Sequence, residues 1–188
     1  MGFSSPVEDQ IKNLRRVRNQ LITAVEFKNI ELEKSKEEIT KLENQITQEK
    51  DEIKQFSHSL SKEDLELRAK KLISLEKDKA REKQNNERLD KYNELLKNNL
   101  NSVESKINEL EFYKNIKGVN DVLTNLIDTS NEISKNAITI LTTNENDDKN
   151  KGELTAIDKV ITGNNKTPDD VLKEILGDTK TVENGGFY

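Results

Sequence analysis

The chain contains no cysteine and no tryptophan, and it has only two prolines among 188 residues. Without cysteine it can form neither a disulfide framework nor a thiolate metal site. Aromatic residues make up 4% of the chain and hydrophobic residues 31%, which is low for an ordinary globular core, whereas 36% of the residues are charged. This composition fits either a disordered chain or long helices with a narrow apolar seam.

Long apolar runs are also absent. None approaches the roughly 18–20 residues needed to cross a bilayer, and the first ten residues lack the basic region and apolar stretch of a signal peptide. We therefore expect an intracellular protein, cytoplasmic or nuclear, that is neither secreted nor transmembrane. The formal net charge is −5, and the acidity lies in residues 118–188, which hold 7 basic and 13 acidic side chains.

Apolar residues recur at alternating steps of four and three from Val7 to Leu60. Twelve of these sixteen positions are apolar, and no glycine or proline interrupts the pattern. Such a repeat predicts a coiled-coil helix over about residues 7–58. Its seam is expected to bind partner helices through Leu14, Leu21, Val25, Leu32, Ile39, Leu42 and Ile46. Arg18 and Lys28 occupy seam positions too, and we interpret them as residues that set register and partner choice.

A second helix is predicted over about residues 62–117. Its part of the partner-binding seam is Leu96, Leu100, Val103, Ile107 and Leu110. The stretch 76–88 has Ala80 as its only apolar side chain, so we expect an exposed helical strut. Gly118 is expected to end the helix in the left-handed conformation.

A third helix, shorter and broad-faced, is expected after Asn120. Its natural partner is the apolar face widened by Val17, Ile22, Ala24, Phe27 and Ile30, which together with the C-terminal half of the second helix predicts a small three-helix core. Residues 138–143 are rich in β-branched side chains, so helix and strand both stay open there.

The segment Ser57–Asp64 is either a turn or part of one continuous helix. A five-residue step between Leu60 and Leu65 breaks the repeat, and Ser61 precedes Asp64 at capping distance, which favours a turn. Because no glycine or proline is present, a stutter within one long helix stays an alternative. The overall prediction is an all-α fold with a long antiparallel hairpin. Residues 31–43 would then face the polar strut, which predicts association with further helical chains, identical or different.

The C-terminal third is expected to be an acidic arm that ends in a short helix. We predict a helical domain over 7–141, a flexible linker with a weak short helix over 142–166, a docking helix over 167–177 and a disordered tail over 178–188. Thr167, Pro168 and the following aspartates are typical of a helix start. The apolar face of the docking helix, formed by Val171, Leu172, Ile175 and Leu176, is expected to enter the groove of another protein. Docking on the chain's own bundle is the alternative.

No pattern typical of catalysis or of metal or cofactor binding occurs. The one histidine, His58, stands in a polar stretch and is expected to be solvated. Phosphate-binding loops, dinucleotide motifs and nucleophile motifs are missing from the sequence. We therefore expect a protein that is not an enzyme and has no cofactor, and the basic cluster 12–18 is interpreted as helix surface rather than a nucleic-acid site.

The functional hypothesis is a structural subunit that assembles through coiled-coil packing and recruits a partner through its C-terminal helix. The layout of a long hairpin, shorter helices, an acidic arm and a terminal docking helix also resembles ESCRT-III proteins. That resemblance implies membrane remodelling by a helical hairpin, although the nearly neutral first helix favours it less. A viral or phage scaffolding protein is a further alternative.

Overall fold

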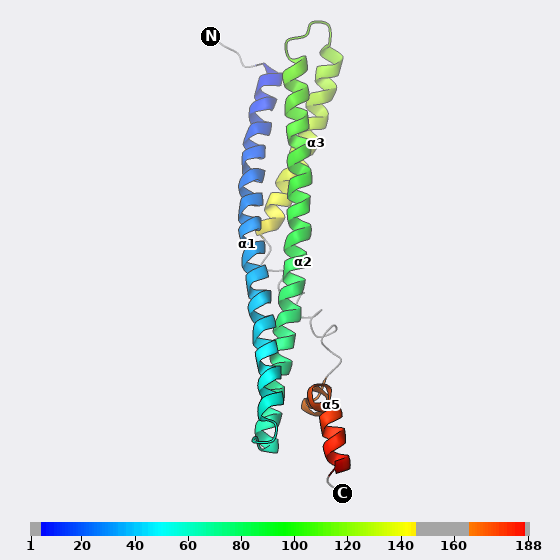
Figure 1. Cartoon of the computed structure of the whole chain (residues 1–188). Coiled ribbons are helices and arrows are strands. Elements are labelled where there is room, and N and C mark those ends of the chain that lie inside the picture. Colours follow the sequence, from blue (N-terminus) through cyan, green and yellow to red (C-terminus); the bar gives the residue numbers. More distant parts are fainter. Residues whose placement is uncertain (1–4, 146–165, 187–188) are drawn as a thin grey trace. The chain divides into compact units, whose positions relative to one another are not determined.

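A computed structural model describes residues 5–145 and 166–186 of the chain. These residues form α-helices and no strand. Helix α1 spans Pro6–Phe56, α2 spans Lys62–Tyr113, α3 spans Asn120–Glu145 and α5 spans Pro168–Gly186 (Figure 1). The prediction of an all-α fold with two long helices and a shorter third one is confirmed.

The segment after Phe56 is a turn. The backbone N–H groups of Ser59 and Leu60 both donate to the carbonyl oxygen of Phe56, at 2.9 and 3.1 Å. Helix α2 then starts with a side-chain cap, because the N–H of Asp64 donates to the hydroxyl of Ser61 at 3.1 Å. The antiparallel hairpin is therefore confirmed and the continuous helix is wrong. Hydroxyl and backbone groups close this turn without glycine or proline.

Polar contacts between α1 and α2 record the register of the hairpin. Asn29 contacts Asn93 at 2.8 Å, and Lys50 pairs with Glu76 at 3.6 Å. In both pairs the two residue numbers add up to between 120 and 130, as expected for two helices folded back at a turn near residue 60. The heptad seam predicted from the sequence is therefore the inner face of the hairpin.

The chain divides into two compact units. Unit 1 comprises residues 1–32 and 87–150, and unit 2 comprises residues 33–86 and 151–188. Unit 1 contains the predicted three-helix core, made by the first half of α1, the second half of α2 and α3. Its buried members are Ile11, Leu14, Val17, Leu21, Ala24, Leu96, Val103, Ile107, Leu110, Leu126 and Ala137.

The wide apolar face of α1 is covered only in part. Val17 and Ala24 are buried and Ile22 is half-buried, as predicted, but Phe27 and Ile30 remain 61% and 53% exposed. Phe27 follows the core-facing Ala24 by three residues and precedes the buried Lys28 by one, so it projects about 60° from the first and 100° from the second around the helix. The sequence analysis was therefore wrong to assign Phe27 and Ile30 to the three-helix core.

The polar strut 76–88 is partly buried rather than exposed. It is helical as predicted, but eight of its thirteen residues are partly buried. Leu42 of α1, in the same unit, is only 6% exposed, and Lys79 pairs with Glu43 at 3.8 Å. Long polar side chains can cover apolar surface with their methylene stems, so a stretch with Ala80 as its only apolar residue still packs against α1.

Several helix ends differ from the prediction. Helix α2 ends at Tyr113 rather than near 117, because the chain enters a turn in which the N–H of Ile116 donates to the carbonyl of Tyr113. Helix α3 includes residues 138–143 and runs to Glu145, and α5 continues beyond Gly177 to Gly186. Two parts of the prediction lie outside the described residues. They are residues 146–165 of the linker, with its weak short helix, and residues 187–188 of the tail.

Gly118 has a φ of 80°, the left-handed conformation predicted for it. Gly118→Ala is expected to lower the free energy of unfolding by about 1–2 kcal/mol, since an L side chain is strained there, although a Cβ would meet no atom within 4 Å. Gly177→Ala is the matched control, because that site is equally open but has no left-handed φ. Urea denaturation measures both, and equal stabilities would contradict the expectation.

Candidate functional site

Helix α5 packs against an apolar surface that α1 and α2 form within unit 2. Its Val171 and Leu172 are 6% and 8% exposed, and Ile175 and Leu176 are partly buried. All four belong to one hydrophobic cluster with side chains of α1 and α2. The buried residues on the hairpin side are Ile46, Ile53, Ala69 and Leu72, with Leu65, Ile73 and Leu75 packed around them. We call this set the tip groove.

The start of α5 is a reciprocal capping box. The N–H of Asp170 donates to the Thr167 hydroxyl at 3.2 Å, and the N–H of Thr167 donates to the Asp170 carboxylate at 3.1 Å. Pro168 occupies the first helical position, where its missing N–H costs nothing. Lys166 adds an ion pair to Glu174 at 2.9 Å. The segment thus satisfies its own N-terminal polar groups.

The capping box lowers the pKa of Asp170 below the ordinary 3.8, first through the backbone hydrogen bond from Thr167 and then through the Thr167 side chain. Because the folded pKa is the lower one, this contribution to the stability of α5 is present above the ordinary pKa and is lost as the pH falls through the folded pKa. Asp170→Asn is expected to remove that acid dependence. An NMR titration of the Asp170 carboxyl and the Thr167 amide measures it, and a carboxyl that titrates at 3.8 or above would contradict it.

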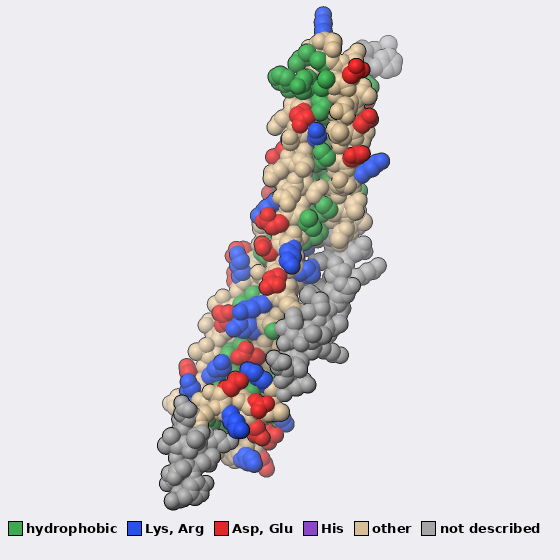
Figure 2. Space-filling model, turned by 90° about the vertical axis from the view of Figure 1, so that its right-hand side faces the viewer, with side chains coloured by type: hydrophobic (Ala, Val, Ile, Leu, Met, Phe, Trp, Pro, Cys, Tyr) green, Lys and Arg blue, Asp and Glu red, His purple; other side chains and the backbone are tan. Residues whose placement is uncertain are grey.

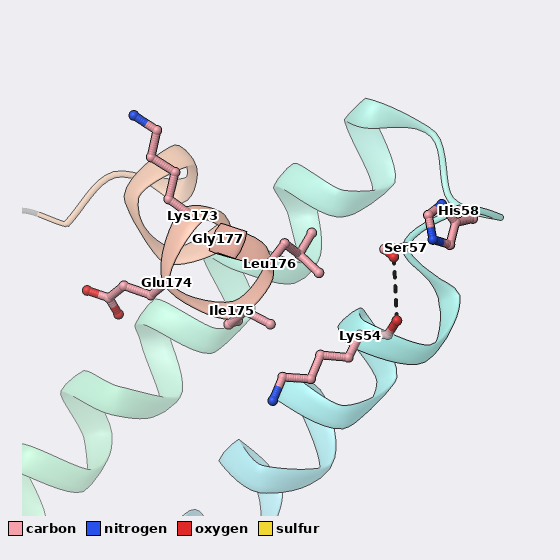
Figure 3. Close-up of a pocket in the computed structure, with 8 residues that line it drawn as sticks. All are labelled: Lys54, Ser57, His58, Lys173, Glu174, Ile175, Leu176 and Gly177. Atoms are coloured by element: carbon pink, nitrogen blue, oxygen red, sulfur yellow. Dashed lines mark hydrogen bonds between the residues drawn. The ribbon is translucent and has the colours of Figure 1, made fainter. Parts of the chain in front are cut away.

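Beside the tip groove lies an open pocket of about 580 Å³. Lys54, Ser57 and His58 line one side, from the end of α1 and the turn, and residues 173–177 of α5 line the other (Figure 3). The Ser57 hydroxyl donates to the carbonyl of Lys54 at 3.4 Å. His58 is exposed, as predicted. The pocket is a gap between α5 and the hairpin turn rather than an enclosed cavity.

Ion pairs hold α1 to α2 next to the tip groove. Glu49 is 4% exposed and lies 3.4 Å from both Arg68 and Lys71. Arg68 also donates to Glu52 at 2.8 Å, and this hydrogen bond is the main cause that lowers the pKa of Glu52 and raises that of Arg68. These contacts lie between α1 and α2, so the two walls of the groove are joined to each other without α5.

Lys28, predicted to set register, is a buried cation in unit 1. Its side chain is 3% exposed, pairs with Glu31 at 3.2 Å and lies 5.3 Å from the centre of the Tyr92 ring. The Tyr92 hydroxyl in turn donates to the carbonyl of Ile140 in α3. The other predicted register residue, Arg18, is half-buried. A cation, an aromatic ring and a carbonyl from three helices therefore meet in one polar layer of the core.

The residues predicted to bind partner helices lie inside the chain's own hairpin. Most of them are buried and the rest are partly buried; in unit 1 they belong to the three-helix core or pack against it, Leu32 excepted. The set comprises Leu14, Leu21, Val25, Leu32, Ile39, Leu42, Ile46, Leu96, Leu100, Val103, Ile107 and Leu110. Their role in binding a second chain stays a prediction, whereas the structure uses them to fold the hairpin.

Two kinds of site residue were missed from the sequence. The first is the groove wall, in which the fully buried Ala69 is part of the cluster that receives α5. The second is Asn93, which is 1% exposed and donates to Asn29. Asn93 stands between Leu89 and Leu96 at steps of four and three, so its seam position was visible in the sequence. Ala69 likewise stands between Leu65 and Leu72 at steps of four and three, so the repeat places it in the seam as well.

The surface carries charges of both signs. Figure 2 shows basic and acidic side chains interleaved over the face in view. Within residues 5–145 and 166–186, no group of three or more histidine, cysteine, aspartate or glutamate side chains could hold a metal ion. None of the helices described is long and apolar enough to cross a membrane.

The search of protein-family models, of curated proteins and of solved structures found no match.

Proposed function

We propose that this protein is a non-catalytic helical interaction subunit, which recruits a partner through α5 and the tip groove. The observation that carries the proposal is the seating of one amphipathic helix, through Val171 and Leu172, against the apolar side chains of two others. Helix-in-groove packing of this kind is a common mode of peptide recognition. The groove and the helix that fits it are thus the two halves of a binding pair.

The energetics suit a reversible contact. Burying a valine or leucine side chain contributes roughly 1.5–3 kcal/mol, and α5 buries two such side chains and covers two more in part. The conformational entropy that the helix loses when it is ordered must be subtracted from this gain in free energy. The surplus is small, so α5 can leave the groove when a competing helix is available.

The chemistry of the site also fits binding rather than bond making. The buried side chains that α5 shares with the tip groove are apolar. The polar groups of α5 include a cap and an ion pair, Thr167 with Asp170 and Lys166 with Glu174. Assembly with other helical chains through the exposed apolar residues of unit 1 is a further part of the proposal. Phe27, Phe112 and Val122 are examples, at 61%, 66% and 41% exposed.

A labelled peptide of residues 166–186 tests the proposal by fluorescence anisotropy. In the wild-type chain the peptide must displace the chain's own α5, whereas Leu172→Asp places a charge on the buried face and empties the groove. We expect the peptide to bind the Leu172→Asp chain at least about tenfold more tightly than the wild type, because apparent affinity scales with the fraction of open groove.

The matched control is the same peptide carrying Leu172→Asp, which should bind neither chain. Absence of binding by the wild-type peptide to the Leu172→Asp chain would overturn the proposed function. Equal binding of the two peptides would do the same, since it would show that the apolar face is not what the groove recognises.

A further inference from the structure

We propose that the partner of the tip groove is α5 of a second copy of this chain, so that two copies exchange their C-terminal helices. This inference rests on the proposed function above and names the partner of the same site. Each copy would contribute α5 to the groove of the other, with the same side chains in contact as within one chain.

Helix α5 has the properties of a transferable unit. Its N-terminal polar groups are satisfied by its own Thr167 and Asp170, and its Lys166 pairs with its own Glu174. Its contact with the hairpin is the apolar face that contains Val171 and Leu172. Exchange therefore breaks and remakes the contacts of this apolar face and leaves the cap at Thr167 closed.

The groove is equally independent of α5. Two of its side chains, Ile53 and Ala69, are both 0% exposed and come from the two arms of the hairpin. Glu49 joins those arms through Arg68 and Lys71. Every copy of the chain therefore has the same groove, and α5 of any copy is complementary to it.

The covalent connection permits the exchange. Twenty residues, 146–165, separate the end of α3 from the first described residue before α5. A chain of that length spans at most about 70 Å when extended, which is enough to reach the groove of a neighbouring molecule. Because the contacts are the same within and between chains, protein concentration decides the balance, as in other exchanges of identical elements.

The absence of cysteine makes this testable by site-specific cross-linking in the full chain. Ser57 and Gly177 line the same pocket from opposite sides (Figure 3). A Cβ at Gly177 would meet no atom within 4 Å, so there is room to begin a cysteine side chain there. Chains with Ser57→Cys alone and chains with Gly177→Cys alone are mixed at high concentration and treated with a short bis-maleimide. The double variant, at low concentration, reports docking within one chain.

We expect a covalent heterodimer from the mixture, and at least a tenfold loss of it when the Gly177→Cys chain also carries Leu172→Asp. Ser102→Cys, on an exposed surface of unit 1, replaces Ser57→Cys as the collision control. A double variant that cross-links within one chain while the mixture gives no heterodimer would overturn the exchange and leave the docking of α5 intact. If the double variant also fails to cross-link, the docking and the proposed function fail together. A heterodimer insensitive to Leu172→Asp would overturn the exchange as well.

Discussion

Replacing Leu14 with alanine is expected to lower the free energy of unfolding by about 2–5 kcal/mol. Leu14 is 0% exposed and lies in the core shared by α1, α2 and α3. Truncation removes the transfer free energy of the buried methyl groups and leaves a cavity that two long, continuous helices can close only in part. Urea denaturation followed by far-ultraviolet circular dichroism measures the change.

Leu95→Ala is the matched control for this prediction. The substitution is the same and the residue lies in the same unit, but Leu95 is 50% exposed, so the expected change is within about 0.5 kcal/mol. If the two variants lose equal stability, the three-helix core of unit 1 does not pack as described. The comparison also separates packing from helix propensity, since leucine and alanine differ little as helix formers.

Leu172→Ala is expected to release α5 from the tip groove. Loss of a buried leucine costs about 2 kcal/mol or more, and this corresponds to a drop of about 30-fold in the ratio of docked to undocked α5. Hydrogen exchange of the α5 backbone amides reports that ratio directly. The amides of unit 1 should keep their protection, which makes them an internal reference.

Lys173→Ala isolates the effect of the apolar face. Lys173 is the next residue along α5, about 100° further around the helix, and is exposed, so this alanine lies away from the buried face. Protection of α5 should change little in this variant. Protection that falls equally in both variants would mean that helix propensity, rather than burial in the groove, holds α5 in place.

Periodicity was sufficient to predict the hairpin because both long helices bury one narrow stripe. The seam positions Ile11, Leu14 and Leu21 follow the four-three repeat and all lie in the core. The same repeat could not predict the burial of residues 76–88, since partly buried residues there, such as Lys79 and Gln84, are polar. Nor could it exclude Phe27 from the core, because an apolar side chain at the margin of the seam is equally compatible with solvent.

The surface against which α5 packs could not be predicted from the sequence, for a different reason. The pattern Val171, Leu172, Ile175 and Leu176 predicts an apolar face, and the capping box around Thr167 predicts where the helix starts. Neither feature says which groove receives that face. The tip groove is assembled from Ile46, Leu72 and Ala69. The four-three repeat includes all three positions, but it does not show that α5 packs against them.

The antiparallel register of α1 and α2 also restricts how the length of this chain can change. Seven residues inserted after Asn29 alone would displace it from Asn93 by about 10 Å along the helix axis, and the polar layer at Lys28 would lose the Tyr92 ring. A compensating insertion of seven residues before Tyr92 would restore both contacts. The hairpin can therefore be lengthened or shortened only in matched pairs of heptads, one in each arm, which provides a construction rule for building longer or shorter versions of it.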